Sequence, residues 1–224
     1  METTKKLKPK KTESSIHSKI TSAYRDYLLT EGKCPVTVFK FCKTIGIKEA
    51  DFYAHYASFD ALEKSIWADY VAHTRKRMES DKSYGGFTAR EKILTFYFSL
   101  AELLKSDRSF VIHQLRSIKN PAVTPVFLKG FKLLFEEWIK GVLNEGKGTG
   151  EIAKRPFVDE RYDSLFWIHL MFILQFWTHD ESPNFEKTDV AIEKSVTLAF
   201  ELIGKGILDT ALDFGKFLFQ NSKN

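Results

Sequence analysis

Apolar residues recur at helical spacing through this chain, and this period constrains the fold more than any other feature of the sequence. The first such series comprises Ile16, Ile20, Ala23, Tyr24, Tyr27 and Leu28. Residues three and four apart share one face of a helix, so the series predicts an amphipathic helix, with Gly32 placed to end it. The alternation of apolar and polar residues that marks a strand does not persist in the N-terminal third of the chain. We therefore predict an all-α fold.

Two short helices joined across a glycine are predicted next. The first covers residues 37–45 with Thr37 as its N-cap, Gly46 ends it, and the second covers residues 48–56. Glycine accepts the positive φ of a tight turn, and apolar inner faces would hold the two helices at the fixed angle of a helix-turn-helix. These faces carry Phe41, Cys42, Ile45 and Phe52. Many helical hairpins bind no DNA, so this pattern alone leaves DNA binding open.

The rest of the chain is also helical by pattern. Ser58 is placed to cap a fourth helix that continues towards Ser80. Six further helices are expected over residues 88–106, 107–119, 124–145, 159–180, 187–205 and 206–220, with glycine- and proline-containing breakers between most of them. Gly146 is expected to cap the third of these at its C-terminus, whereas the junction at Gly204 and Gly206 could be only a kink.

The positive charge of the chain is concentrated at its N-terminus. The net charge is +5, and residues 1–12 contribute +4 from five lysines and one glutamate, whereas residues 13–60 are neutral. Such a tail is either a disordered arm that contacts a polyanion through Lys8, Lys10 and Lys11, or a solubilising terminus. The predicted organisation is this tail over residues 1–12, a helix-turn-helix domain over 13–60, and a linking helix with a C-terminal domain over 61–224.

Several classes of protein are excluded by residue usage. Cys34 and Cys42 cannot form a disulfide framework or a four-ligand metal site, and the six histidines follow no metal-binding pattern. No apolar run reaches the roughly 18–20 residues of a membrane span, and the N-terminus lacks the apolar core of a signal peptide. Residues 141–147 match a phosphate-binding loop, but Gly148 replaces the required Ser or Thr. We expect a cytoplasmic protein that is not an enzyme and needs no metal or cofactor.

Residues 19–62 resemble the N-terminal domain of the tetracycline repressor (TetR) family of bacterial regulators. The matching residues are Ile20, Ala23, Gly32, Thr37-Val38, Gly46-Ile47, Phe52-Tyr53, His55-Tyr56, Ser58 and Leu62. The match extends over about a fifth of the chain and keeps the family's spacing throughout. The resemblance implies a long linking helix and an all-helical ligand-binding and dimerisation domain, in a homodimer that binds double-stranded DNA.

The resemblance also assigns candidate DNA-binding residues. Thr37, Lys48, Tyr53 and His55 fall where family members contact phosphates or base edges. Two positions depart from the family pattern, because Lys48 replaces the usual Ser at the start of the recognition helix and Phe59 replaces a lysine that contacts phosphate.

Two acidic residues of the recognition helix, Glu49 and Asp51, are also candidate DNA-binding residues. Carboxylates can accept from the amino group of cytosine, but phosphates repel them. Acids in the first turn also stabilise a helix through its dipole, by about 0.3–1 kcal/mol. A neutral helix-turn-helix domain would depend on the lysine tail for the electrostatic part of its DNA affinity.

The aromatic C-terminal half has two interpretations, either a large bundle core or a set of residues around an apolar ligand cavity. Under the second, the candidate ligand-binding residues are Phe96, His113, Phe131, Trp138, His169 and Phe172. His169 lies on a nearly all-apolar segment, where such a residue either contacts a ligand or is a hydrogen-bonded core histidine.

Residues 165–177 are apolar nearly all round, so one side would face its own domain and the other a second subunit. The favoured hypothesis is a homodimeric TetR-like repressor that binds a pseudo-palindromic operator until a small apolar ligand changes the spacing of its recognition helices. The alternative is a protein of this fold that binds lipid or another ligand and has lost sequence-specific DNA binding.

Overall fold

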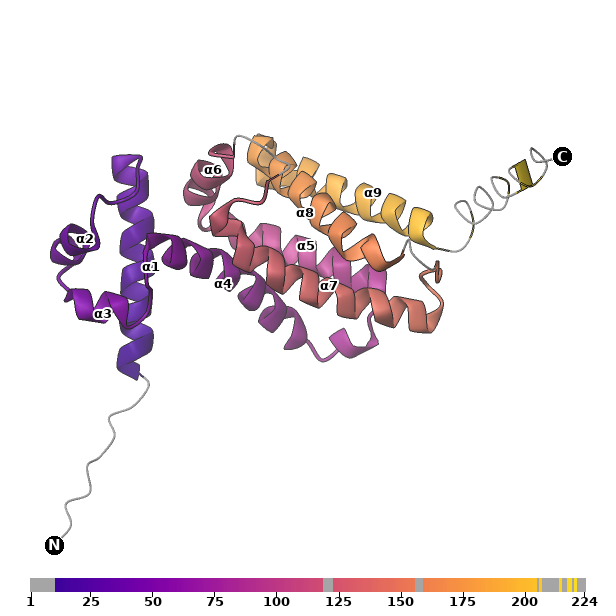
Figure 1. The fold of residues 1–224 in the computed structure, drawn as a ribbon. Helices are drawn as coiled ribbons and strands as arrows, with labels where there is room; N and C mark the ends of the chain where they lie inside the picture. Colours follow the sequence, from indigo (N-terminus) through magenta and orange to yellow (C-terminus); the bar gives the residue numbers. More distant parts are fainter. Residues whose placement is uncertain are drawn as a thin grey trace, which may run out of the picture. The chain divides into compact units, whose positions relative to one another are not determined.

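The computed structural model describes residues 11–118, 123–155 and 159–204, with residues 206, 214, 217, 218 and 220 beyond them. All regular secondary structure in these residues is helical (Figure 1), and the predicted all-α fold is confirmed. The α-helices are α1 (Lys11–Glu31), α2 (Val38–Ile45), α3 (Glu49–Tyr53), α4 (Phe59–Glu79), α5 (Ala89–Lys105), α6 (Arg108–Arg116), α7 (Lys129–Thr149), α8 (Tyr162–His179) and α9 (Glu186–Ile203).

Helices α2 and α4 begin where their capping residues predict. Thr37 Oγ1 accepts a hydrogen bond from the Lys40 backbone N–H (3.2 Å), and Ser58 Oγ accepts one from that of Ala61 (3.2 Å). Each bond satisfies a backbone donor that the first turn of a helix leaves without a partner. These local bonds fix the start of α2 and α4.

The chain forms two compact units, and α4 contributes to both. One unit combines residues 1–67 with 108–128, and the other combines 68–107 with 129–224. Helix α6 therefore belongs with α1, α2 and α3, whereas the sequence pattern grouped residues 107–119 with the C-terminal domain. Two contacts join α6 to this first unit: Gln114 Nε2 donates to Glu63 Oε1 (2.9 Å), and the Arg25 guanidinium lies 5.7 Å from the centre of the Phe110 ring.

The second unit is a bundle in which α5 packs on α7 and α9, and α8 packs on α7 and α9 (Figure 1). Its core is aromatic. The rings of Phe96 and Trp138 are stacked with centroids 4.3 Å apart, and Phe135 lies 5.5 Å from Phe96. Pairs at these distances add to the free energy gained by burying the rings.

Helix α7 begins and ends later than predicted, and Gly146 lies inside it. The expected C-cap at Gly146 is wrong, because the helix continues to Thr149 and the positive φ belongs to Gly150 (81°). A Cβ at position 146 would lie 2.9 Å from Ala89 Cβ and 2.7 Å from Ile152 Cδ1. Glycine is therefore required here for the close approach of α7 to α5 and to the following loop.

Helix α9 ends at Ile203, at the junction around Gly204 that the sequence left open as either a helix end or a kink. The buried Arg155 side chain donates from Nη2 to Gly204 O (2.6 Å) and from Nη1 to Ile203 O (3.1 Å) and Tyr162 Oη (3.0 Å). A guanidinium satisfies several of the carbonyls that the last turn of a helix leaves without partners. Most of the helix predicted over residues 206–220 lies outside the described residues.

Candidate nucleic-acid interface

The turn between α2 and α3 has the geometry of a helix-turn-helix. Gly46 adopts the left-handed conformation (φ 67°, ψ 46°), and its backbone N–H donates to Cys42 O. The following N–H, of Ile47, also donates to Cys42 O (3.0 Å). A side chain at Gly46 would be strained in this conformation, so the glycine permits the sharp turn that separates the two helices.

An aromatic cluster fixes the angle between these helices. Phe41 and Phe52 are buried with ring centroids 6.3 Å apart, and Phe59 lies 5.5 Å from Phe41 and 5.6 Å from Phe52. Tyr24 of α1 stacks on Phe59 at 5.6 Å. Phe59, which departs from the TetR pattern, is thus a packing residue that joins α4 to α1, α2 and α3.

Helix α3 presents an exposed surface on the side away from this cluster. Lys48, Glu49, Ala50 and Tyr53 are exposed, and Tyr53 keeps 53% of its surface, whereas Phe52 is fully buried. Thr37, at the start of α2, is exposed as well as capping its helix. Exposed polar side chains on a short helix held at a fixed angle can reach base edges and phosphates.

The carboxylates of Asp51 and Glu49 have different environments. The Asp51 carboxylate accepts from the Lys48 backbone N–H (Oδ2, 3.1 Å), and the Asp51 N–H donates to Lys48 O (3.0 Å). The carboxylate therefore closes the first turn of α3 in the manner of a capping box. Asp51 is half-buried, whereas Glu49 is exposed.

His55 lies just after α3 and packs on α1. Its ring is 6.3 Å from that of His17 and 6.2 Å from that of Tyr56, and all three residues are wholly or partly buried. This places His55 against the helix that supports α3. Of the three tail lysines, Lys8 and Lys10 lie outside the described residues; Lys11 opens α1, and its side chain is likewise outside them.

Four of the predicted ligand-binding residues lie within the second unit's core or beside it. Phe96 and Trp138 are stacked, and Phe131 is fully buried with its ring 5.9 Å from that of Trp167. His169 lies next to Tyr97, whose ring is 6.3 Å from that of Phe96. Phe135 and Tyr97, which connect these residues, are not among the six candidates, because aromatic spacing alone does not say which rings meet.

His169 is hydrogen-bonded on both sides of its ring. Nε2 lies 2.8 Å from Ser195 Oγ on α9, and Nδ1 lies 3.2 Å from Tyr97 Oη on α5. Ser195 Oγ also donates to Ile192 O (3.3 Å), and Tyr97 Oη also lies 3.5 Å from Phe166 O. A neutral ring protonated at Nε2 donates to Ser195 and accepts at Nδ1 from Tyr97. Burial lowers the pKa of His169 to about 4, because desolvation disfavours the imidazolium.

Phe172 and His113 do not join this group. Phe172 is 52% exposed on α8, and His113 belongs to α6 in the first unit.

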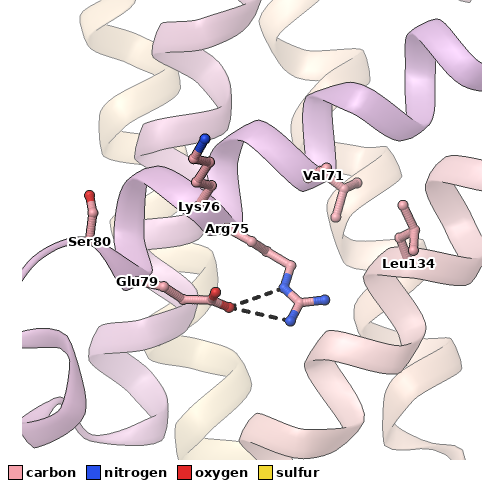
Figure 2. A pocket seen from close by; sticks show the side chains of 7 residues that line it. Val71, Arg75, Lys76, Glu79, Ser80 and Leu134 are labelled. Atoms are coloured by element: carbon pink, nitrogen blue, oxygen red, sulfur yellow. Dashed lines mark hydrogen bonds and ion pairs between the residues drawn. The ribbon is translucent and has the colours of Figure 1, made fainter. Parts of the chain in front are cut away.

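A groove of about 460 Å³ runs between α4 and α7 in the second unit, and it involves none of the predicted residues. Figure 2 shows Val71 and Arg75 on α4 and Leu134 on α7 at its edges. Arg75 donates from Nε and Nη2 to Glu79 Oε1 at 3.3 Å, so its charge is offset within the groove. A second depression, of about 400 Å³, does include Phe172, beside Phe176 and His179.

Within the ranges that the structure describes, no three His, Cys, Asp or Glu side chains are placed to hold a metal ion. No helix among the described residues is both long and apolar enough to cross a membrane.

Comparison with known proteins identifies the family of the C-terminal part of the chain. A family model for the tetracyclin repressor-like C-terminal domain matches residues 92–218, more than half of the chain. No curated protein matches the chain.

Solved structures share the fold at low sequence identity. A structure assigned to the TetR family of transcriptional regulators, from Syntrophomonas wolfei, superposes with a TM-score of 0.67 at 13% identity and covers 87% of this chain and 98% of its own. A similar one from Shewanella sp. PV-4 has a TM-score of 0.59 at 12% identity, with 82% and 97% covered. The regulator FadR from Bacillus subtilis, in complex with stearoyl-CoA, has a TM-score of 0.56 at 16% identity, with 85% and 99% covered.

Proposed function

The chain belongs to the tetracycline repressor-like family, and we propose that it is a homodimeric, ligand-responsive repressor that binds a pseudo-palindromic operator in double-stranded DNA. The observation that carries this proposal is the exposed side of α3, with Lys48, Glu49 and Tyr53 on a helix fixed by the Phe41–Phe52–Phe59 cluster. A rigid support of this kind lets a short helix enter the major groove in one orientation.

An apolar surface on α8 and α9 supports the homodimer. Leu165, Ile168 and Phe172 follow one another at helical spacing on α8 and are 53%, 63% and 52% exposed, while Phe166 and Leu170 of the same helix are buried. On α9 the exposed apolar residues are Val190, Leu198 and Leu202. Exposed apolar side chains in such a series are typical of a protein contact, and a self-complementary contact gives a two-fold dimer. Two-fold symmetry would present two copies of α3 to two half-sites.

The effector in this proposal is a small apolar molecule held in the second unit. The support is the aromatic core around Phe96, Trp138 and Phe131, together with the Tyr97–His169–Ser195 hydrogen bonds that link α5, α8 and α9. A ligand placed among these helices would alter their packing and so shift the population of DNA-binding conformations. The FadR complex holds stearoyl-CoA, and the acyl chain of that molecule is a group of this apolar chemistry.

A specific observation favours the second candidate, a ligand-binding protein of this fold without sequence-specific DNA binding. Val36 and Phe39 flank Thr37 and are 74% and 59% exposed. Apolar side chains beside the candidate phosphate contact suit a protein partner better than a polyanion.

The test is selection of DNA from a random library with the purified, ligand-stripped protein at several salt concentrations. Recovery of a palindromic motif with a steep salt dependence supports the repressor. If the tail of residues 1–12 neutralises phosphates, its deletion lowers the slope of log K against the logarithm of the salt concentration, by about one for each phosphate concerned. A folded dimer that selects no motif at any salt concentration contradicts the repressor proposal and favours the second candidate.

A further inference from the structure

The two acidic residues of α3 have different environments, and we propose that only Glu49 reads DNA sequence, by accepting a hydrogen bond from the N4 amino group of a cytosine. This inference rests on the proposed DNA binding and names the base pair that the site recognises.

The Asp51 carboxylate is hydrogen-bonded within the first turn of its own helix. Its Oδ2 accepts from the Lys48 N–H at 3.1 Å, and its side chain is half-buried. On a helix with 3.6 residues per turn, residues two positions apart point about 160° away from each other. Asp51 therefore lies on the other side of α3 from Glu49, where it stabilises the first turn.

Glu49 lies on the exposed side. It is exposed, as are Ala50 beside it and Tyr53 one turn later. Residues four apart share a helix face, so Glu49 and Tyr53 project in similar directions. No hydrogen bond or ion pair joins the Glu49 carboxylate to any other residue that the structure describes.

The chemistry of a carboxylate restricts what it can face in the major groove. An ionised carboxylate only accepts hydrogen bonds, and guanine N7 and O6 and thymine O4 are acceptors too, so they repel it. Adenine offers a donor next to an acceptor, whereas cytosine offers the N4 amino group. The exposed Lys48 at the adjacent position supplies a cation that offsets repulsion between the carboxylate and nearby phosphates.

The experiment compares the DNA motifs selected by the wild type, Glu49→Ala and Glu49→Gln, followed by affinity measurements at one salt concentration. The wild type is expected to prefer C·G at one position of each half-site, by tenfold or more over the other pairs. Glu49→Ala should lose the preference at that position and keep the rest of the motif. Glu49→Gln should shift it towards adenine, whose N6 and N7 a glutamine can bind together.

Asp51→Asn is the matched control, because an amide oxygen can still accept from the Lys48 N–H. It should select the wild-type motif, and circular dichroism should show that all the variants are folded. A wild-type motif that Glu49→Ala leaves unchanged at every position overturns the assignment of Glu49 while the repressor proposal stands. No motif from the wild type overturns both.

Discussion

The His169 side chain extends from α8 and forms hydrogen bonds with two neighbouring helices of the second unit. One ring nitrogen is bonded to Tyr97 of α5 and the other to Ser195 of α9. Both bonds are satisfied by the neutral ring, and burial lowers its pKa from 6.5 to about 4. Of the two roles that the sequence left open for this histidine, the structure gives it the hydrogen bonds of the core role. Contact with a ligand remains part of the proposal.

This environment predicts a loss of stability in mild acid. In the unfolded chain the imidazole takes up a proton near its ordinary pKa of 6.5, whereas in the folded protein it does so only near 4. The free energy of unfolding is therefore unaffected by His169 above pH 6.5. It falls by up to ~3 kcal/mol as the pH is lowered from 6.5 to 4, because the unfolded chain binds the proton more tightly. Urea unfolding at pH 7 and pH 4.5 measures the difference for the wild type and for His169→Gln.

The variant separates His169 from other titrating groups. Glutamine keeps a donor and an acceptor but does not titrate, so the pH-dependent loss should be smaller by about the amount assigned to His169. An equal loss in the two proteins would show that His169 does not cause it.

At the scale of the helices, substitution of alanine for Gly146 and for Gly141 makes the same chemical change in a crowded and in an open environment. Both lie in α7, but a Cβ at 146 would meet Ala89 Cβ at 2.9 Å, and one at 141 would meet nothing within 4 Å. Ala89 Cβ is fixed to the backbone of α5, so the helices would have to move apart.

We expect Gly146→Ala to lower the free energy of unfolding by about 1–3 kcal/mol through overpacking. The control Gly141→Ala should raise it by up to ~1 kcal/mol, because alanine is the better helix former. Thermal or denaturant unfolding of the two variants checks both signs. Equal stabilisation by the two alanines would mean that α5 and α7 are not closely packed at Gly146.

At the scale of the whole molecule, the apolar surface of α8 predicts how the proposed dimer can be broken. Ile168→Glu places a charge at the centre of the surface formed with Leu165 and Phe172, and burying an unpaired charge is costly. Sedimentation of the variant should show a monomer, with DNA affinity reduced by tenfold or more because two half-sites are no longer bound together.

Leu133→Glu is the matched control. Leu133 is 67% exposed on α7 and is not one of the residues of the proposed dimer surface, so this variant should stay dimeric with the affinity of the wild type. A wild type that is monomeric, or an Ile168→Glu protein that is still dimeric, would contradict the assignment of this surface.

The linear pattern of residues was enough to predict where α1 to α9 lie to within a few residues at their ends, the caps at Thr37 and Ser58 and the turn at Gly46. The same pattern carries the resemblance to the TetR family. These features depend on hydrogen bonds and apolar spacing within a few residues, which a linear pattern contains. Two of the candidates at the start of α3, Lys48 and Glu49, are exposed, and their contact with DNA stays a prediction.

Contacts between segments that are far apart in the chain could not be predicted from the sequence and are decided by the fold. The fold groups α6 with α1, places Gly146 within α7 against Ala89, puts Phe59 into an aromatic cluster and leaves Phe172 outside the core. The physical reason is that burial and close approach depend on the packing of helices far apart in the chain, and neither composition nor period records that packing.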